Sequence, residues 1–170
     1  MTLLAVVLVA SILGILGGLG YDAPAEWTSK PSSSSMRVAQ WELLGDDAPA
    51  EVVIFYFGEG GGGGVDANLD RWFGQFEQPD GSSTREKATI TELSVNGLEL
   101  TIADMRGTFV APVRPGVRER SHRPGHRMIA AVVEGGSGPW YIRVLGSEAT
   151  ITKWEASVDA FLSSLRLETP

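Results

Sequence analysis

The chain has 170 residues, of which 43% are hydrophobic and 21% are charged, as expected for a folded globular domain. Its formal net charge of -7 argues against general affinity for nucleic acids, because phosphate binding needs a basic surface. The sequence contains no cysteine, which excludes disulfides, thiol catalysis and thiolate metal sites.

The first twenty residues carry no charged side chain, and the stretch from Leu3 to Leu16 is apolar apart from Ser11 and Gly14. We therefore expect a signal peptide or membrane anchor over residues 1–20, followed by a single domain over residues 21–170. No Lys or Arg precedes the apolar run and no clean A-x-A site follows it, so cleavage stays open. The segment predicts an exported protein, either periplasmic or held at a membrane by its N-terminus.

Three strands are predicted before the glycine-rich stretch. Residues 21–27 are interrupted by a proline and suggest an edge strand, and residues 36–43 alternate as a strand does. Residues 52–57 (VVIFYF) are apolar at every position, which predicts an interior strand covered on both faces.

A helix is predicted after the glycines. Its apolar side chains share one helical face, at Val65, Leu69, Trp72, Phe73 and Phe76. Asp66 is expected to cap the start of this helix, and Pro79 and Gly81 are expected to end it.

The glycine-rich stretch 58–64 contains G-x-G-x-x-G between a predicted strand and a predicted helix, which is the setting of a dinucleotide-binding loop. No second parallel strand with an acidic residue follows, and no Walker lysine is present. The stretch therefore indicates a flexible joint. Asp66 and Glu77 also fall at calcium-loop spacing, but a helix would separate them by about 16 Å, too far to share an ion.

The second half of the chain favours hairpins. Asn96 and Gly97 predict a tight turn between residues 89–95 and 98–103, and this turn places Val95 opposite Leu98. Residues 109–126 are expected to form a proline-rich basic loop. Two strands (127–134 and 140–146) and an amphipathic helix then follow, the helix with apolar positions at Ile151, Trp154, Val158, Phe161, Leu162 and Leu165.

Because hairpins dominate, a parallel doubly wound sheet is excluded. The element order instead predicts an α+β fold, with a mainly antiparallel sheet of about seven strands and helices on its faces.

Four stretches resemble exported bacterial proteins of unassigned function: the strand with Trp27, SSSMRVAQW (33–41), NLDRWFGQFEQPDG (68–81) and GPWYIRVLG (138–146). Those proteins are similar to the PsbP-like α/β/α sandwich fold, and the resemblance spans residues 20–166. It implies a sandwich with a binding or assembly role, as in the extrinsic photosystem II subunit and a Ran-binding import factor. It brings no catalytic motif and no functional residue, and a fold alone does not define a function.

A run of basic residues provides the candidate binding site. It consists of Arg114, Arg118, Arg120, Arg123 and Arg127, with Glu119 as the acidic residue among them. Such local charge in an acidic chain predicts contact with an acidic protein or an anionic membrane surface. A solvated surface loop is the alternative.

No metal site, cofactor site or catalytic group is predicted. His122 and His126 have i, i+4 spacing, but Pro124 and Gly125 prevent the helix that would bring them together. Ser137 lies outside any G-x-S-x-G pattern. The sequence therefore favours a noncatalytic cell-envelope binding or assembly module. An enzyme of unrecognised type with a pocket beside the sheet, and a small-ligand carrier, stay open as alternatives, and converging polar groups in a cavity would favour either over a surface-binding module.

Overall fold

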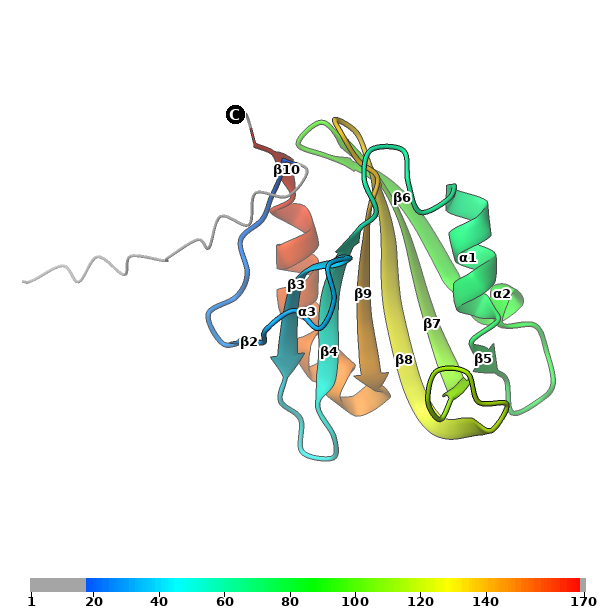
Figure 1. The fold of residues 1–170 in the computed structure, drawn as a ribbon. Coiled ribbons are helices and arrows are strands. Elements are labelled where there is room, and N and C mark those ends of the chain that lie inside the picture. Colours follow the sequence, from blue (N-terminus) through cyan, green and yellow to red (C-terminus); the bar gives the residue numbers. More distant parts are fainter. Residues whose placement is uncertain (1–17, 169–170) are drawn as a thin grey trace, which may run out of the picture.

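The computed structural model describes residues 18–168 (Figure 1). Most of the expected signal peptide or anchor over residues 1–20 therefore lies outside the described residues. Between residues 18 and 168, no helix combines the length and the apolar character needed to cross a membrane.

The elements follow one another along the described chain as a series of strands with three helices inserted. In order they are β1 (Leu19–Gly20), β2 (Thr28–Ser29), β3 (Arg37–Leu43), β4 (Ala50–Tyr56), α1 (Val65–Phe73), β5 (Phe76–Glu77), α2 (Thr84–Lys87), β6 (Thr89–Val95), β7 (Leu98–Pro112), β8 (Arg120–Glu134), β9 (Trp140–Ser147), α3 (Glu148–Ser163) and β10 (Arg166–Leu167).

Eight of these strands form one antiparallel sheet in the order β2-β3-β4-β9-β8-β7-β5, and β6 pairs with the part of β7 that β5 leaves free. The short strands β1 and β10 form a separate antiparallel pair. The predicted α+β class and the mainly antiparallel sheet are confirmed, with eight strands in the sheet where about seven were expected.

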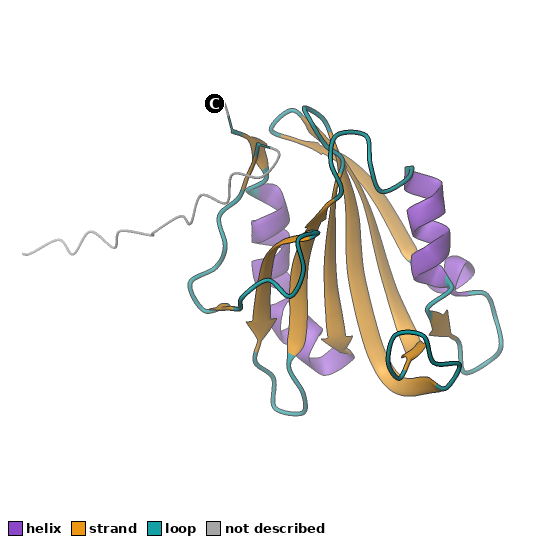
Figure 2. Ribbon diagram, viewed as in Figure 1, coloured by secondary structure: helices purple, strands orange, loops and turns teal. Residues whose placement is uncertain are grey.

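The sheet has a hydrophobic core on each face. The long helix α3 packs on one face, where Phe161 and Val158 meet Val52, Ile54 and other side chains of β4, β9 and β8. Helix α1 packs on the opposite face, where Leu69 lies in one cluster with side chains of β7 and β8. Figure 2 shows the two helices on opposite sides of the sheet, with α1 near the β6–β7 edge.

The closing helix forms where its apolar spacing predicts it. Ile151, Val158 and Phe161 are each 0% exposed in α3, whereas Leu165, also 0% exposed, lies beyond the end of the helix at Ser163. The helix begins at Glu148, before the first apolar position, because Ser147 caps it by accepting a hydrogen bond from the Thr150 amide at 3.2 Å.

The tight hairpin also forms as predicted. Val95 is paired with Leu98 and Leu93 with Leu100. Asn96 and Gly97 both have positive φ, of 47° and 83°, which is the conformation that a two-residue hairpin requires.

Helix α1 is shorter than expected. It ends at Phe73, and Phe76 belongs to β5, where it pairs with Phe109 of β7. The residue at the helix start is Gly64, with no side-chain hydrogen bond, so the prediction that Asp66 caps the helix is wrong. Phe76 is buried in the same core as the helix because β5 lies directly beneath the helix end.

Two other expectations are corrected. Residues 21–27 form no strand, and β1 and β2 flank them instead. The expected loop over residues 109–126 is largely paired, because Pro112 lies opposite Arg120 and the connecting loop covers residues 113–119 only. Pro124 and Gly125 fall where the β7–β8 register shifts, and a bulge accommodates a proline and a glycine with φ of 64° within a strand.

Strand β4 lies inside the sheet as predicted, but helices do not cover both of its faces equally. Val52 and Ile54 are 0% exposed against α3. On the other face Val53 is also 0% exposed, but Phe55 is only half-buried at the border of the α1 core. Helix α1 lies over β7 and β8, so the face of β3 and β4 on that side has no helix above it (Figure 2). This uncovered half of the sheet is the setting for the candidate site.

Candidate functional site

A groove of about 140 Å³ lies between α1 and the uncovered half of the sheet. Its lining combines aromatic rings, two amides and two arginines: Phe55, Phe57, Asn68, Arg71, Trp72, Gln75, Tyr141 and Arg143. We refer to this site as the groove.

The periodicity of each element places these side chains together. Alternate residues of a strand share one face, and the register sets Phe55 of β4 opposite Tyr141 of β9. Arg143, two residues further along β9, therefore lies on the same face. Arg71 and Trp72 follow Asn68 by three and four residues, so both lie beside Asn68 on the surface of α1.

The glycine-rich stretch is held by side-chain hydrogen bonds from two residues that line the groove, Asn68 and Tyr141. Asn68 Nδ2 donates to the carbonyl oxygens of Gly62, Gly63 and Gly64 at 3.1, 3.3 and 2.9 Å. The Tyr141 hydroxyl lies 2.9 Å from the oxygen of Gly61 and 2.6 Å from that of Gly63. The stretch thus directs several carbonyl oxygens toward Asn68 and Tyr141, whereas a phosphate-binding loop would direct amide hydrogens at its ligand.

These contacts need glycine at one position in particular. Gly62 has φ of 87°, and a Cβ atom there would lie 2.4 Å from the Tyr141 ring. The chain can follow this path only without a side chain, since both the left-handed backbone and the close approach disfavour one. The stretch is therefore a loop with a fixed path, held by contacts with Asn68 and Tyr141, rather than only a flexible joint.

Arg143 is the most unusual group in the groove. Its side chain is 22% exposed, and its Nη2 lies 3.4 Å from Glu51 Oε2. The same carboxylate makes a shorter contact of 2.8 Å with Arg37 and accepts a hydrogen bond from Gln40 at 3.0 Å. Arg143 Nε has no hydrogen-bond partner within residues 18–168. Arg143 is thus a largely desolvated cation that shares its counter-ion with a second arginine.

The electrostatics agree with this geometry. Burial lowers the pKa of Arg143, and the nearby charge of Arg37 acts in the same direction, while Glu51 opposes both. The guanidinium also lies 5.5 Å from the centroid of the Phe55 ring, and Arg37 lies 5.4 Å from the same ring. Two cations thus flank one aromatic side chain, an arrangement that cation–π attraction supports.

The remaining lining groups give the groove an apolar rim and a second arginine. Phe57 is 43% exposed and stacks on Phe55 with ring centroids 6.3 Å apart. Arg71, on the opposite wall from Arg143, donates to Asn68 Oδ1 and makes no ion pair among the described residues. Gln75 Oε1 is buried and likewise lacks a hydrogen-bond partner in this part of the chain.

Arg127 does not belong to an exposed basic site, which corrects the sequence-based prediction. Its side chain is 1% exposed and points to the α3 face. It donates to Asp104 through Nε at 2.9 Å and Nη2 at 2.7 Å, and to Glu155 through Nη1 at 3.0 Å. These hydrogen bonds raise the pKa of Arg127, so it is a structural cation joining β7, β8 and α3.

The other four predicted arginines are exposed at the end of the β7–β8 hairpin: Arg114, Arg118, Arg120 and Arg123. None of them lies within 4 Å of a carboxylate oxygen of the described residues. Arg123 also borders a hollow of about 240 Å³ with His126, Lys30 and Glu42. We call these four residues the basic hairpin end.

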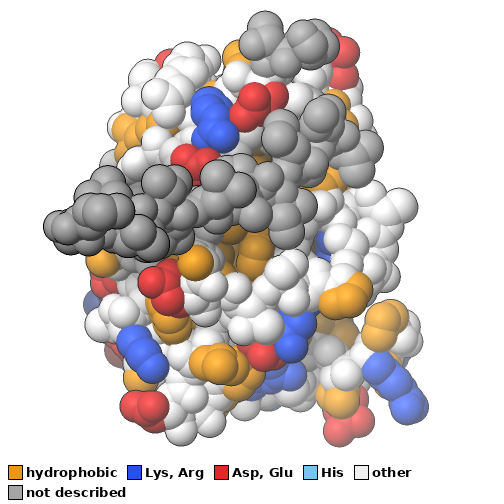
Figure 3. All heavy atoms as spheres, turned by 90° about the vertical axis from the view of Figure 1, so that its left-hand side faces the viewer, with side chains coloured by type: hydrophobic (Ala, Val, Ile, Leu, Met, Phe, Trp, Pro, Cys, Tyr) orange, Lys and Arg blue, Asp and Glu red, His pale blue; other side chains and the backbone are white. Residues whose placement is uncertain are grey.

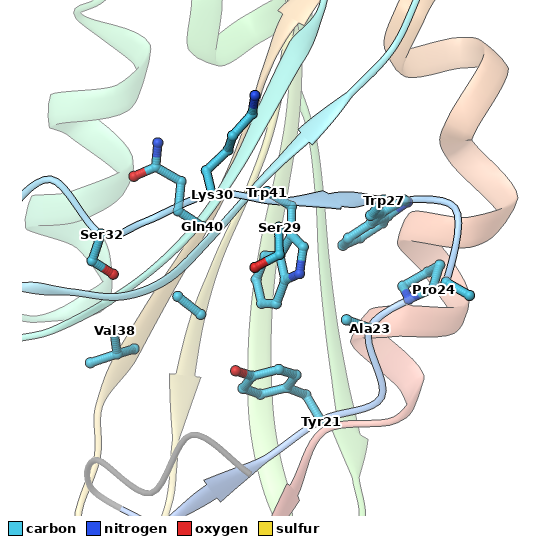
Figure 4. Close-up of a pocket in the computed structure, with 12 residues that line it drawn as sticks. Tyr21, Ala23, Pro24, Trp27, Ser29, Lys30, Ser32, Val38, Gln40 and Trp41 are labelled. Carbon is cyan, nitrogen blue, oxygen red and sulfur yellow. The ribbon is translucent and has the colours of Figure 1, made fainter. Parts of the chain in front are cut away.

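A third hollow, of about 290 Å³, lies beside β2 and β3 and is rich in aromatic groups. Figure 4 shows Tyr21, Trp27 and Trp41 around it, with Lys30 directed away from Tyr21. Lys30 pairs with Glu42 at 3.2 Å, and Trp27 donates to Ser157 at 3.1 Å. The side of the molecule facing this edge carries scattered charges of both signs (Figure 3). Lys30 and Trp27 thus already have partners, and the described residues that line this hollow include no cation that, like Arg143, lacks a carboxylate of its own, so it is secondary to the groove.

The histidines do not meet. His122 Nδ1 lies 3.5 Å from Glu77, and the His126 ring stacks on Phe109 with centroids 6.3 Å apart. In residues 18–168, no cluster of three or more His, Asp or Glu side chains has the geometry to hold a metal ion.

The groove has one signal in the sequence. Arg143 interrupts an apolar strand, WYIRVLG, at a position whose neighbours are all hydrophobic. A charge at such a position is uncommon unless it is paired or functional. Its partner Glu51 is 92 residues away, a separation that local pattern does not predict. Comparison with known proteins gives no match, either to a protein-family model or to a curated protein.

Proposed function

We propose that this protein is a noncatalytic binding module that holds a small anionic ligand in the groove between α1 and the uncovered half of the sheet. The observation that supports this most strongly is Arg143, a cation removed from much of the solvent without a carboxylate of its own. Keeping such a group in the folded state costs stability, and an anionic ligand would offset that cost. Arg71 on the opposite wall adds a second cation for the same ligand.

The lining also favours binding over catalysis. General acid–base and nucleophilic chemistry use His, Asp, Glu, Lys, Ser or Cys side chains placed against the substrate. The groove is lined instead by arginine, amide and aromatic groups, and its one titratable hydroxyl, Tyr141, has its pKa raised by burial. A phenol that resists deprotonation and already contacts the glycine carbonyls is a poor general base.

We further propose that this module works in the cell envelope and belongs to the PsbP-like class of sandwich folds. The apolar segment at residues 1–20 supports export, and the four stretches with Trp27, Trp41, Trp72 and Trp140 support the class. Helices on both faces of an antiparallel sheet are compatible with it.

The proposal can be tested by equilibrium dialysis of the purified full chain against a small-molecule extract of the cells that produce it. Compounds retained by the protein are identified by mass spectrometry for the wild type, Arg143→Gln and Arg118→Gln. The two substitutions remove the same charge, one in the groove and one at the basic hairpin end. We expect the wild type and Arg118→Gln to retain an acidic compound that Arg143→Gln loses. Equal retention by all three proteins would contradict the proposal.

The basic hairpin end supports a second candidate function, contact with an acidic protein or an anionic membrane surface. Its arginines are exposed and make no ion pair with described carboxylates, so their charges are free to act on a partner. Vesicle sedimentation with anionic and zwitterionic lipids tests this. Replacing Arg118, Arg120 and Arg123 by Ser should remove binding to anionic vesicles, whereas replacing Arg85, Lys87 and Lys153 by Ser should not. Equal loss in both triple variants would show general charge attraction only.

A further inference from the structure

We infer that the ligand of the groove is a small aromatic carboxylate, bound with its carboxylate at Arg143 and its ring against the aromatic rim at Phe57. This inference rests on the proposed function and specifies its ligand class. Three properties of the groove lead to it: the shape of the cation, the nature of the walls and the size of the space.

The cation favours a carboxylate. A guanidinium presents a planar set of N–H groups that matches the two oxygens of a carboxylate, and Arg143 uses only a 3.4 Å contact to Glu51. A phosphate would call for converging backbone amides, but Gly60 and Gly61 donate their amides to the carbonyls of Gly138 and Gly58. The adjoining glycine carbonyls face Asn68 and Tyr141. The glycine-rich stretch next to the groove is therefore not built as a phosphate cradle.

The walls favour an aromatic body. Phe55, Phe57, Trp72 and Tyr141 account for half of the eight lining residues, and Phe57 leaves part of its ring open to solvent. Phe57 also meets the Tyr141 ring in an edge contact at 5.6 Å. A flat ring placed beside Phe57 would extend this existing series of aromatic contacts. A strongly hydrated inorganic anion would gain nothing from these walls.

The size favours a small molecule. The groove measures about 140 Å³, below the roughly 300–1,000 Å³ of sites that enclose drug-sized ligands. A single substituted ring fits such a space better than a nucleotide or a folded peptide segment does. Phe57 and Arg143 line the same groove, and the Phe55 ring lies 6.3 Å from the Phe57 ring and 5.5 Å from the Arg143 guanidinium.

The test is calorimetric titration of the full chain with three probes: benzoate, cyclohexanecarboxylate and inorganic phosphate. Benzoate and cyclohexanecarboxylate have the same charge and similar size, and they differ in the flat ring. We expect benzoate to bind about three- to tenfold more tightly than cyclohexanecarboxylate, the range expected for aromatic pairing. We expect phosphate to bind more weakly than both.

Variants connect this binding to the groove. Arg143→Gln should weaken benzoate binding about ten- to a hundredfold, because it removes charge-assisted hydrogen bonds. Arg143→Lys keeps the charge without the planar fork and should recover only part of the loss. Phe57→Ala changes an exposed ring, leaves the fold intact and should abolish the preference for benzoate over cyclohexanecarboxylate. Arg118→Gln is the charge-matched control and should leave all titrations unchanged.

The outcomes separate the two levels of the proposal. Tighter binding of phosphate than of benzoate, weakened by Arg143→Gln, would overturn the aromatic carboxylate and keep the anion-binding groove. Binding of benzoate that ignores both Arg143→Gln and Phe57→Ala, or no binding of any probe, would overturn the groove as a ligand site.

Discussion

Replacing Arg127 by methionine tests whether this arginine belongs to the folded framework rather than to a binding surface. Methionine keeps most of the volume of the buried stem and removes the guanidinium, so the substitution isolates the polar contacts. Four hydrogen bonds of 2.7 to 3.3 Å are lost, two to Asp104, one to Glu155 and one to Thr152. The side chains of these carboxylates are 24% and 46% exposed, so water can solvate both of them in part.

The expected cost follows from these exposures. A net hydrogen bond to a charged group contributes about 1.5–3 kcal/mol, and breaking a fully buried pair costs about 3–5 kcal/mol. The contact with Glu155 is discounted because that side chain is nearly half exposed. We therefore expect Arg127→Met to lower the free energy of unfolding by about 2–4 kcal/mol, and Tm by about 5–15 °C for a chain of this size.

Urea denaturation followed by circular dichroism measures this change, with Arg120→Met as the matched control. Arg120 is exposed and pairs with no described carboxylate, so its replacement should change stability by less than about 0.5 kcal/mol. Adding Asp104→Asn to Arg127→Met should cost much less than Asp104→Asn does in the wild type. If Arg127→Met and Arg120→Met have the same free energy of unfolding, Arg127 is not the structural cation described above.

The pH dependence provides an independent check on the same group. Hydrogen bonding and charge attraction from Arg127 lower the pKa of Glu155 in the folded state. The stabilisation from this carboxylate is therefore present above its unfolded pKa of about 4.3 and is lost as the pH falls through the lower folded pKa. Arg127→Met should reduce this acid-induced loss of stability, because without the guanidinium the pKa of Glu155 in the folded state moves back toward its value in the unfolded state.

Three further predictions concern single contacts. The pKa of Asp47 is lowered to about 2, mainly by the hydrogen bond from Ser147, so Asp47→Asn should lessen the fall in urea midpoint between pH 4 and pH 2. Gly62→Ala should lower the free energy of unfolding by at least about 1–2 kcal/mol because of its positive φ, and by more if the Tyr141 ring cannot move. Gly64→Ala, at an open position with φ of -78°, should cost far less in the same urea titration. Tyr141→Phe should lower the free energy of unfolding by about 1–2 kcal/mol, because it removes the hydroxyl that contacts the glycine carbonyls. An unchanged urea midpoint would show that the glycine-rich stretch does not depend on this hydroxyl.

The parts of the fold that sequence predicts well are those with a local physical cause. Asn96 and Gly97 can adopt the positive φ values of a tight hairpin, and the apolar spacing after Ile151 leaves a helix one face to bury. Both features depend on residues a few positions apart. They appear in the structure where the sequence places them.

The basic run shows why a local pattern was not enough elsewhere. Pro112, Pro124 and Gly125 suggest a loop, but the long pairing of β7 with β8 absorbs them at a strand end and a bulge. Once β8 is known to continue through this region, the alternation of its side chains sets Arg127 on the α3 face with Ile129. Charge alone could not separate this buried arginine from its exposed neighbours, because the counter-charges come from β7 and α3.

The groove was beyond local prediction for a related reason. It arises because α1 ends at Phe73 and lies over β7 and β8, which leaves the adjoining face of β4 without a helix. The apolar sequence of β4 is compatible with helices over the whole of both faces or over part of one face. Only the tertiary arrangement decides between these two cases. The expectation of an even sandwich therefore missed the space where Arg143 lies.

Two arginines of the sheet, one on each face, illustrate how these faces differ. Arg127 meets two carboxylates at hydrogen-bond distance and its pKa is raised, whereas Arg143 shares one carboxylate with Arg37 and its pKa is lowered by burial. A buried cation with its own carboxylates at hydrogen-bond distance stabilises the fold. A buried cation without such partners costs stability, and an apolar residue at the same position would avoid that cost. The α3 face therefore carries the framework of the protein. Arg143 on the other face lines the groove, and an anionic ligand bound there would give this cation a partner of its own.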